Sequence, residues 1–344
     1  MVQERLGHVT RGWQYVEVPL EGIDRQDETY ARSFPRKPPP ELLRSIAEIG
    51  VTQPVFVSEK PSREWRIIHG FRRFWAALDL GIPTVPAFVI DEAGWDARKL
   101  YEWTLLQDLG HRRYNRVELA LVLRNLRDRL GASAEELVAM LRRLAGLGGP
   151  KQVERLLRLP DLEPPVLEWI VEENPPDDAL DIILSWPPED RLELAALARS
   201  LRWSSGEQRE VIRLLDDLAQ SHGQSPSALL KSPEVALLLD RNGSPSQKTQ
   251  RLIQALRAKR FPIVSQLAQE FREIVSALKP PRGVQLEHSP SFESEEVLFH
   301  LRARSPADFS RLLEELARMA RSEAFPRLFC LGSAGREPDR DEPD

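Results

Sequence analysis

The sequence predicts an α+β protein with a small α/β domain first, an all-helical middle containing a helix-turn-helix, and a small β-β-α unit last. Three observations carry this prediction. Short apolar runs alternate with glycine turns and helical patterns up to about residue 110, and the pattern becomes almost wholly helical from residue 115. Two alternating stretches then precede a capped helix after residue 280.

The expected boundaries follow these changes of pattern. They are an N-terminal domain over 1–110, a helical domain over 111–220, a linker over 221–248, a C-terminal helix with a ββα unit over 249–330, and a disordered tail over 331–344. The stretch 227–240 inside the linker is also compatible with a helix of its own. A chain of 344 residues has room for two or three domains.

Composition indicates a soluble globular protein, with 41% hydrophobic and 29% charged residues. We expect it in the cytoplasm, since no apolar run approaches the roughly 20 residues that span a bilayer and the first residues lack a signal-peptide core. Cys330 is the single cysteine, which excludes an intramolecular disulfide and a cysteine metal cluster. A net charge of −5 argues against a protein that coats nucleic acid indiscriminately.

The N-terminal domain is expected to alternate short strands and helices. The predicted strands are at 15–20, 54–57, 65–69 and 85–90, and the predicted helices are at 41–49, 71–79 and 96–107. The helix at 41–49 follows the triple proline 38–40, which breaks the chain before it.

The most informative turn of this domain lies at Gly70, between an apolar run and a helix that opens with Arg72 and Arg73. Glycine lets the backbone turn tightly, and a helix N-terminus favours an anion. The guanidinium group of an arginine in that first turn can bind two phosphate oxygens at once. The pattern therefore predicts a phosphate-binding corner, although surface arginines after a glycine turn are also common without any ligand. His69, just before the turn, is more simply explained as a hydrogen-bonded structural residue.

The helical middle begins with a basic island. Eleven Lys/Arg against five acids give residues 112–158 a net charge of +6 inside an acidic protein. Helices over 115–130, 134–144 and 150–158, separated by glycine turns, resemble a helix-turn-helix. The expected DNA contacts are Lys151, Gln152 and Arg155 in the groove, and Arg112, Arg113 and Arg116 on phosphates. A small helical bundle with solvated arginines explains the same pattern equally well.

The C-terminal unit is predicted as helix, strand, strand, helix. The helix over 247–278 ends at Pro280-Pro281, the alternating stretches are 283–288 and 297–304, and the last helix runs from 306 to 321 after a Ser305-Pro306 cap. So small a unit buries too little surface alone. We expect two copies to pair across a two-fold axis, and packing on the chain's own helix 247–278 is the alternative.

Several separated motifs resemble one family in order and spacing. They are the run Leu42 to Val57 with Ser45-Ile46, Gly50 and Gln53-Pro54, the run Ile67 to Ala76 with Gly70, Arg72 and Arg73, and the later Gly81, Val85 and Pro86. This pattern resembles the N-terminal domain of the ParB/Spo0J/KorB-like chromosome and plasmid partition proteins, densely over residues 16–120. The resemblance implies the small ParB/sulfiredoxin-like α/β fold and a nucleoid-associated, homodimeric DNA-binding protein. It also implies a ParA-type ATPase partner.

The resemblance further implies a site for CTP and Mg²⁺ that closes a clamp around DNA. Matching the family's motifs onto this chain gives a nucleotide site of Gly70, Arg72, Arg73, Arg32, Gln107, Asp108 and His111, with Asp108 as the metal ligand. Phe71 replaces the family's glutamate, and Gln107-Asp108 exchanges the usual order of carboxylate and carboxamide. The recognition helix also departs from the family, because Gly149-Pro150-Lys151 stands in place of a Ser-Arg pair. We therefore expect a degenerate site that turns over little nucleotide.

Two alternatives remain open. The same small fold occurs in enzymes, including sulfiredoxin, serine kinases and nucleases. Sulfiredoxin is nearly excluded, because Phe71 stands where its cysteine belongs, and a kinase would need Glu102 or Asp108 as its base. A transcriptional regulator or an adaptor that retains the fold without using nucleotide or DNA is the second alternative. The leading interpretation is a DNA-binding partition protein.

Overall fold

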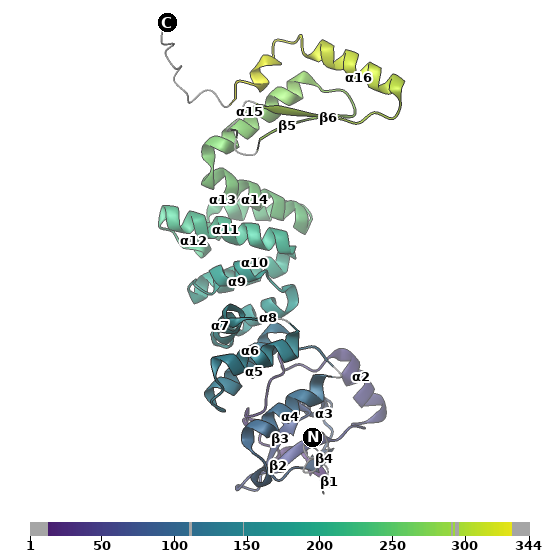
Figure 1. Ribbon diagram of the computed structural model, residues 1–344, viewed down its shortest axis with the longest axis vertical. Helices are drawn as coiled ribbons and strands as arrows, with labels where there is room; N and C mark the ends of the chain where they lie inside the picture. Colours follow the sequence, from purple (N-terminus) through teal and green to yellow (C-terminus); the bar gives the residue numbers. More distant parts are fainter. Residues whose placement is uncertain (1–12, 110–111, 147, 290–291, 293–295, 332–344) are drawn as a thin grey trace. The chain divides into compact units, whose positions relative to one another are not determined.

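The computed structural model describes residues 13–109, 112–146, 148–289, 292 and 296–331 (Figure 1). Two compact units divide the chain, residues 1–199 and 200–344. The predicted α+β class is confirmed, with a strand-containing N-terminal domain, a helical middle and a C-terminal hairpin between helices. In the part of the chain that is described, no helix is long and apolar enough to cross a membrane.

The first unit begins with a four-stranded mixed sheet in the order β1-β4-β2-β3. Its strands are β1 (Gln14–Pro19), β2 (Val55–Glu59), β3 (Trp65–His69) and β4 (Thr84–Val89). β4 pairs antiparallel with β1 and parallel with β2, and β2 pairs antiparallel with β3. The helices of this domain are α2 (Pro40–Ile49), α3 (Phe71–Asp79) and α4 (Ala97–Leu109). Buried Val55, Val57, Ile67 and Ile68 place the core between sheet and helices.

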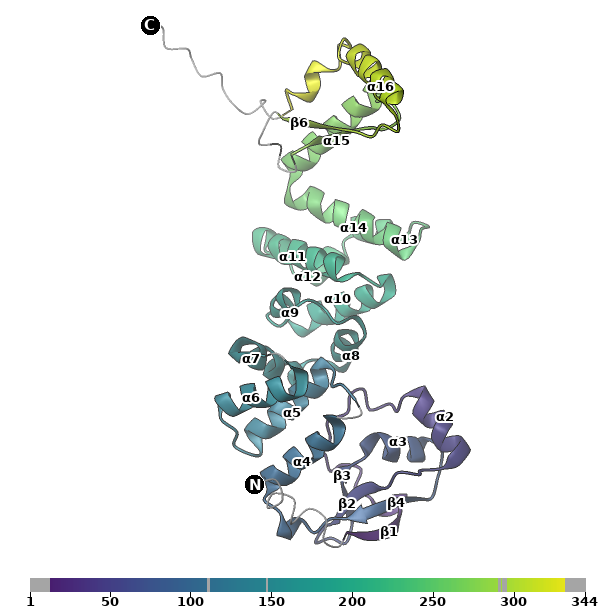
Figure 2. The same ribbon diagram turned by 45° about the vertical axis from the view of Figure 1, so that its right-hand side comes forward.

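Six helices follow in the first unit (Figure 2). They are α5 (Arg116–Asp128), α6 (Ala134–Ala145), α7 (Pro150–Arg158), α8 (Pro164–Glu173), α9 (Asp177–Ile183) and α10 (Pro188–Leu201). Proline pairs stand at or just before the starts of the last three. Proline lacks the N–H that a helix interior requires but is tolerated in the first turn, so each pair ends one helix and starts the next.

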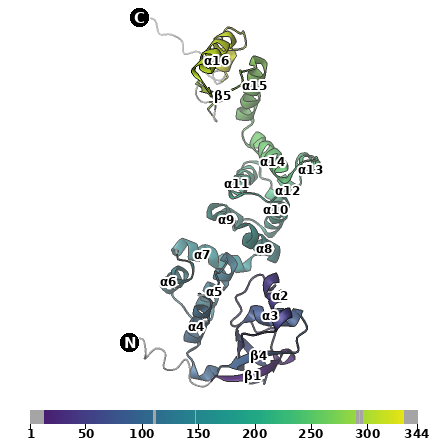
Figure 3. The ribbon, with the colours of Figure 1, turned by 90° about the vertical axis from the view of Figure 1, so that its right-hand side faces the viewer.

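The second unit is helical up to residue 278 (Figure 3). Its helices are α11 (Ser205–His222), α12 (Pro226–Leu230), α13 (Pro233–Asp240), α14 (Pro245–Arg260) and α15 (Pro262–Leu278). The stretch 221–248, expected as a linker, therefore forms α12 and α13, whose Leu229, Leu230 and Val235 are buried. The helix expected over 247–278 is two helices, because Pro262 cannot continue the ladder of hydrogen bonds.

The C-terminal elements follow the predicted order. β5 (Val284–His288) and β6 (Val297–Leu301) form an antiparallel hairpin, and α16 (Pro306–Met319) follows it. One face of the hairpin packs on α15, where Leu286, Val297 and Phe299 join a buried cluster that includes Phe271 and Ile274. The alternative of packing on the chain's own helix is thus present in this unit. The predicted disordered tail lies, after Leu331, outside the described residues.

Candidate functional site

A pocket of about 530 Å³ lies in the N-terminal domain, where β3 meets α3 and α4. The residues that the resemblance assigned to one nucleotide site line it together: Gly70, Arg72, Arg73, Arg32, Gln107 and Asp108. They come from three separate segments of the chain, and only the fold brings them together. His111, the seventh predicted residue, lies outside the described residues.

Gly70 is required by geometry at the entrance to α3. Its φ is +101°, and a Cβ atom there would lie 2.9 Å from Cγ1 of Val55. Left-handed backbone is rarely adopted by other residues, and the strand neighbour leaves no room for one. The carbonyl of Gly70 accepts hydrogen bonds from the N–H groups of Arg73 and Phe74, at 2.9 and 3.1 Å. The turn thereby directs the first turn of the helix toward the pocket.

The two arginines of that turn already have protein partners. Nη2 of Arg72 donates to Oε1 of Glu118 at 2.9 Å. Nη1 of Arg73 donates to the carbonyls of Gln53 and Pro54, at 2.7 and 2.8 Å. Burial lowers the pKa of Arg73, with Asp108 opposing that shift. A phosphate would therefore exchange with these contacts rather than enter a site of free cations.

Asp108 and Arg32 form the buried ion pair at the base of the pocket. Nη2 of Arg32 lies 2.8 Å from Oδ2 of Asp108, and only 3% of the arginine side chain is exposed. Arg32 also donates to the carbonyl and the hydroxyl of Thr104. Although burial alone would raise the pKa of Asp108, the hydrogen bond with His69 and the charges of Arg32 and Arg112 hold that pKa well below its usual range. Both side chains are therefore charged, and their hydrogen bonds fix their positions, which suits a role in stabilising the domain.

His69 lies against the same carboxylate. Its Nε2 is 3.2 Å from Oδ1 of Asp108, and its Nδ1 is buried with no partner among the described residues. Burial lowers the pKa of His69, although Asp108 acts in the opposite direction. The hydrogen-bonded structural role expected from the sequence agrees with this placement.

The pocket fits an anion better than a metal ion. Oδ1 of Asp108 contacts His69, and its Oδ2 accepts from Arg32 and from the Tyr114 hydroxyl at 2.7 Å. Within the described ranges, no three His, Cys, Asp or Glu side chains converge as metal ligands do. Magnesium prefers several oxygen ligands in an octahedral shell. A ligand role for Asp108 would require these hydrogen bonds to break, and it stays a prediction.

Glu118, beside this pocket, is one of the residues that the sequence analysis did not single out. Its carboxylate is 1% exposed and accepts from Arg72 and from Arg112, both at 2.9 Å. It also completes a capping box with Asn115 at the start of α5. The Asn-x-x-Glu spacing that predicts such a cap was visible in the sequence. That its carboxylate would also bind two arginines could not be read from the spacing.

Phe71 and Phe74 are core residues, 8% and 1% exposed. At Phe71 no carboxylate is available to hold a metal or to activate water.

The predicted helix-turn-helix forms a packed three-helix unit of α5, α6 and α7. Ser133 opens α6 with a capping box, and α7 opens with Gly149 and Pro150. At Gly148 a Cβ atom would lie 2.7 Å from Cδ2 of Leu141, so the turn between the two helices needs glycine. Val153 and Leu156 of α7 are buried, which turns the opposite face of that helix outward.

The six predicted DNA contacts differ in their surroundings. Arg113 and Lys151 are exposed, and Gln152 is half-buried. Arg112 is held by Glu118. Arg116 and Arg155 are held by α9.

Arg155 has the most extensive of these internal contacts. Its Nη1 lies 2.6 Å from Asp177, and its Nε and Nη2 lie 2.5 and 2.7 Å from the two oxygens of Asp181. These carboxylates belong to an acidic stretch, residues 161–193, with eleven acids and a single arginine. The change from a basic to an acidic stretch along the sequence could have indicated that these arginines form internal ion pairs. Only the fold shows which carboxylate pairs with which arginine.

Sequence comparisons identify the N-terminal domain. Residues 7–102 match the model of the ParB N-terminal domain. The chain carries a ParB N-terminal domain. Beyond it the likeness continues: a probable chromosome-partitioning protein ParB of Neisseria meningitidis is 29% identical over 186 residues, 54% of this chain and 61% of that protein. A probable plasmid-partitioning protein ParB of Thermus thermophilus is 36% identical over 104 residues, 30% of this chain and 34% of that protein.

The chain is thus distantly homologous to partition proteins, and the match spans less than two thirds of the length of either. Two crystal structures of the C-terminally truncated chromosome-partitioning protein ParB from Caulobacter crescentus are also similar. The complex with CTP-γ-S is 24% identical, covers 53% of this chain and 97% of that one, and has a TM-score of 0.25. The complex with the centromeric parS site is 23% identical, covers 58% and 98%, and has a TM-score of 0.31.

Proposed function

We propose that this chain is a DNA-binding protein of a chromosome or plasmid partition system. The observation that carries the proposal is a ParB N-terminal domain followed directly by a basic three-helix unit. Homology to partition proteins extends over 186 residues, which is longer than the matched domain. A basic surface supplies the sequence-independent part of DNA affinity.

The proposed DNA contacts are the exposed basic residues of this unit that form no ion pair with α9. Arg113, Arg142, Arg143 and Lys151 are exposed. Arg155 instead positions α9 through its two ion pairs. The groove contact is therefore expected from the N-terminal turn of α7, where Lys151 lies.

DNA binding is tested by fluorescence anisotropy of the whole protein with a labelled duplex at several salt concentrations. A linear fall of log affinity with log salt is expected, with a slope smaller by about 0.9 after Lys151→Ala. Lys99→Ala, an exposed lysine of α4, is the matched control. Affinity that does not depend on salt, or an equal effect of the two variants, would contradict the proposal.

The N-terminal pocket is proposed to bind a nucleoside triphosphate, CTP by resemblance to the family, without appreciable hydrolysis. Gly70, Arg72 and Arg73 supply a helix N-terminus and two guanidinium groups for the phosphates. Phe71 supplies no carboxylate for magnesium or water. The kinase alternative lacks a free base as well, because Glu102 pairs with Arg98 and Asp108 with Arg32.

Calorimetric titration with CTP, ATP and GTP in the presence of Mg²⁺ tests this site. Binding of CTP that is lost in Arg73→Ala and kept in Arg44→Ala, an exposed arginine of α2, is expected. Binding of none of the three nucleotides would leave static DNA binding or an adaptor role.

Dimerisation through the C-terminal unit completes the proposal. The hairpin has two strands only, and large apolar side chains remain exposed on β6 and α16: Leu298, Leu301, Phe309 and Leu313, at 58%, 38%, 45% and 48%. A second copy would cover them and extend the sheet. Light scattering is expected to give a dimer that Phe309→Glu with Leu313→Glu converts to a monomer. A ParA-type ATPase is the further partner that this function implies.

A further inference from the structure

A second basic stretch lies in the second unit, outside the proposed nucleotide and DNA sites. Residues 241–260, which include all of α14, contain six Lys/Arg and no Asp or Glu, inside a protein of net charge −5. Such a stretch is often no more than a solvated helix face. It indicates an anionic ligand where several of its cations lack acidic partners and line one depression.

Half of these six cations are neutralised within the protein. Three form ion pairs with carboxylates of α11 and α13: Arg257 with Glu210, Lys259 with Glu234 at 2.8 Å, and Arg260 with Asp217 at 3.3 Å. The other three, Arg241, Lys248 and Arg251, have no carboxylate partner among the described residues. Arg251 donates to the carbonyl of Asn242 at 3.3 Å. The uncompensated charge therefore belongs to the N-terminal half of the stretch.

A groove of about 1360 Å³ brings two of these cations together with one from the next helix. Arg241, Arg251 and Arg272 of α15 line it. Arg272 donates to the Ala268 carbonyl and to the side-chain oxygen of Gln269, both neutral groups. Of the four carboxylates that line the groove, three are the partners of α14 named above, and the fourth, at position 287 in β5, lies 3.1 Å from the His300 ring. The groove thus holds three guanidinium groups that have no carboxylate partner in the described part of the chain.

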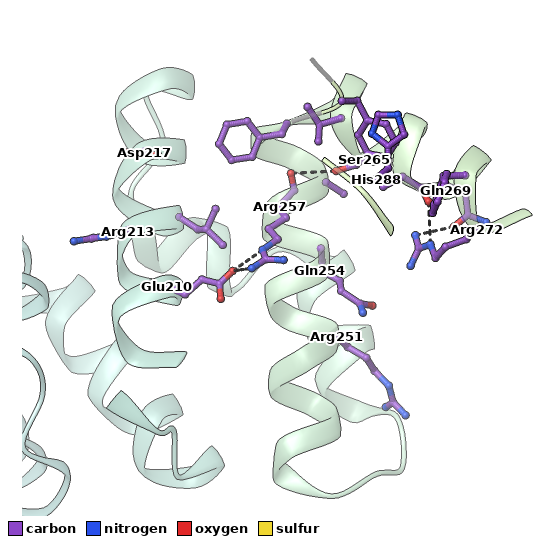
Figure 4. A pocket seen from close by; sticks show the side chains of 18 of the residues that line it. Glu210, Arg213, Asp217, Arg251, Gln254, Arg257, Ser265, Gln269, Arg272 and His288 are labelled. Carbon is purple, nitrogen blue, oxygen red and sulfur yellow. Dashed lines mark hydrogen bonds and ion pairs between the residues drawn. The ribbon is translucent and has the colours of Figure 1, made fainter. Parts of the chain in front are cut away.

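The surroundings of these arginines are polar and small. Figure 4 shows Arg251 and Gln254 extending from α14 on the side away from Glu210. Gln254 and Arg272 are exposed, and the faces of α14 and α15 beside the two arginines carry alanines, at positions 255, 258 and 268. Arginine and glutamine side chains are donors that proteins use for phosphate and sugar oxygens. Small neighbours let a polymer backbone approach these donors closely.

We propose that this groove is a second contact for the backbone of double-stranded DNA, with Arg241, Arg251 and Arg272 on its phosphates. The inference rests on the proposed DNA-binding function and adds a surface in the other unit. Cations that line a depression raise the local concentration of a polyanion, and phosphate contacts read no base sequence. DNA carries a charge at every nucleotide, so arginines from separate segments can each neutralise one phosphate. Peptide grooves depend on apolar anchor pockets, whereas alanines stand beside Arg251 and Arg272.

The test uses the whole protein and a labelled duplex, with anisotropy recorded at several salt concentrations. Arg251→Ala with Arg272→Ala is expected to reduce the slope of log affinity against log salt by about 1.8, since each lost phosphate contact removes about 0.9. The matched control is Arg282→Ala with Arg321→Ala, two exposed arginines of the same unit outside the groove, and it should leave the slope unchanged. Lysine at positions 251 and 272 should preserve the slope, which separates a lost charge from a damaged fold.

Photocrosslinking locates the DNA directly. In a Cys330→Ser background, a benzophenone attached at Gln254→Cys should crosslink to the duplex, and one at Ser276→Cys, an exposed position outside the groove, should not.

The outcomes separate this contact from the proposed function on which it rests. Wild-type protein without salt-dependent DNA binding would refute both. DNA binding that Lys151→Ala weakens, with the groove variant equal to its control, would overturn the groove contact alone. Unchanged DNA affinity together with lost binding of poly-glutamate in the groove variant would also overturn it, and would make the groove a site for an acidic polypeptide.

Discussion

Replacing Arg32 with methionine tests whether the buried ion pair anchors the N-terminal domain. Methionine keeps an unbranched apolar stem but lacks the guanidinium group, so it removes every hydrogen bond to Asp108, Thr104 and Tyr30. Removing one partner of a buried pair costs about 3–5 kcal/mol, because the other charge is left uncompensated. We expect about 3 kcal/mol, the lower end, since Asp108 keeps its contacts with His69 and Tyr114.

The matched control is Arg36→Met. Arg36 pairs with Glu28, but their side chains are 55% and 51% exposed, and such surface pairs contribute below about 1 kcal/mol. Urea unfolding of the whole protein, followed by tryptophan fluorescence, gives both changes in the free energy of unfolding. Equal effects of the two variants would refute the reasoning.

A second variant isolates the charge itself. Asp108→Asn in the Arg32→Met background removes the uncompensated carboxylate, so the double variant should be more stable than the sum of the two single effects predicts. Simple additivity would mean that the two side chains stabilise the domain independently.

Three further predictions concern single residues. Burial lowers the pKa of His69, so the unfolded chain binds its proton more tightly; the free energy of unfolding should fall as pH drops below about 6.5, and His69→Gln should flatten that dependence in urea titrations at several pH values. Gly70→Ala should destabilise by more than about 1 kcal/mol, because φ is positive and Val55 is close; an unchanged midpoint would contradict the assigned geometry. Arg155→Ala should lower the melting temperature through loss of its α9 contacts while weakening DNA binding less than Lys151→Ala, and the reverse order would make Arg155 a DNA contact.

The sequence by itself determined the local structure and the class of fold. The glycine at position 70 and the prolines at 164–165, 175–176 and 187–188 mark where helices begin and end, since both residue types act through their own backbone. The apolar periodicity located the four strands of the first sheet and the hairpin near the C-terminal end. Within the expected linker over 221–248 the sequence indicated at most one helix, over 227–240, and did not separate α12 from α13, because these helices are only five and eight residues long and carry little periodic signal.

Only the tertiary structure decided which charges meet. Asp177 and Asp181 follow Arg155 by more than twenty positions, and Glu118 receives Arg72 from a different helix. Ion pairs depend on distances of a few ångströms, which nothing in linear spacing fixes across separate elements. The basic island at 112–158 therefore overstated the charge available to DNA. Some of its arginines form ion pairs with the protein's own carboxylates. Which arginines are paired depends on how α5, α7 and α9 pack.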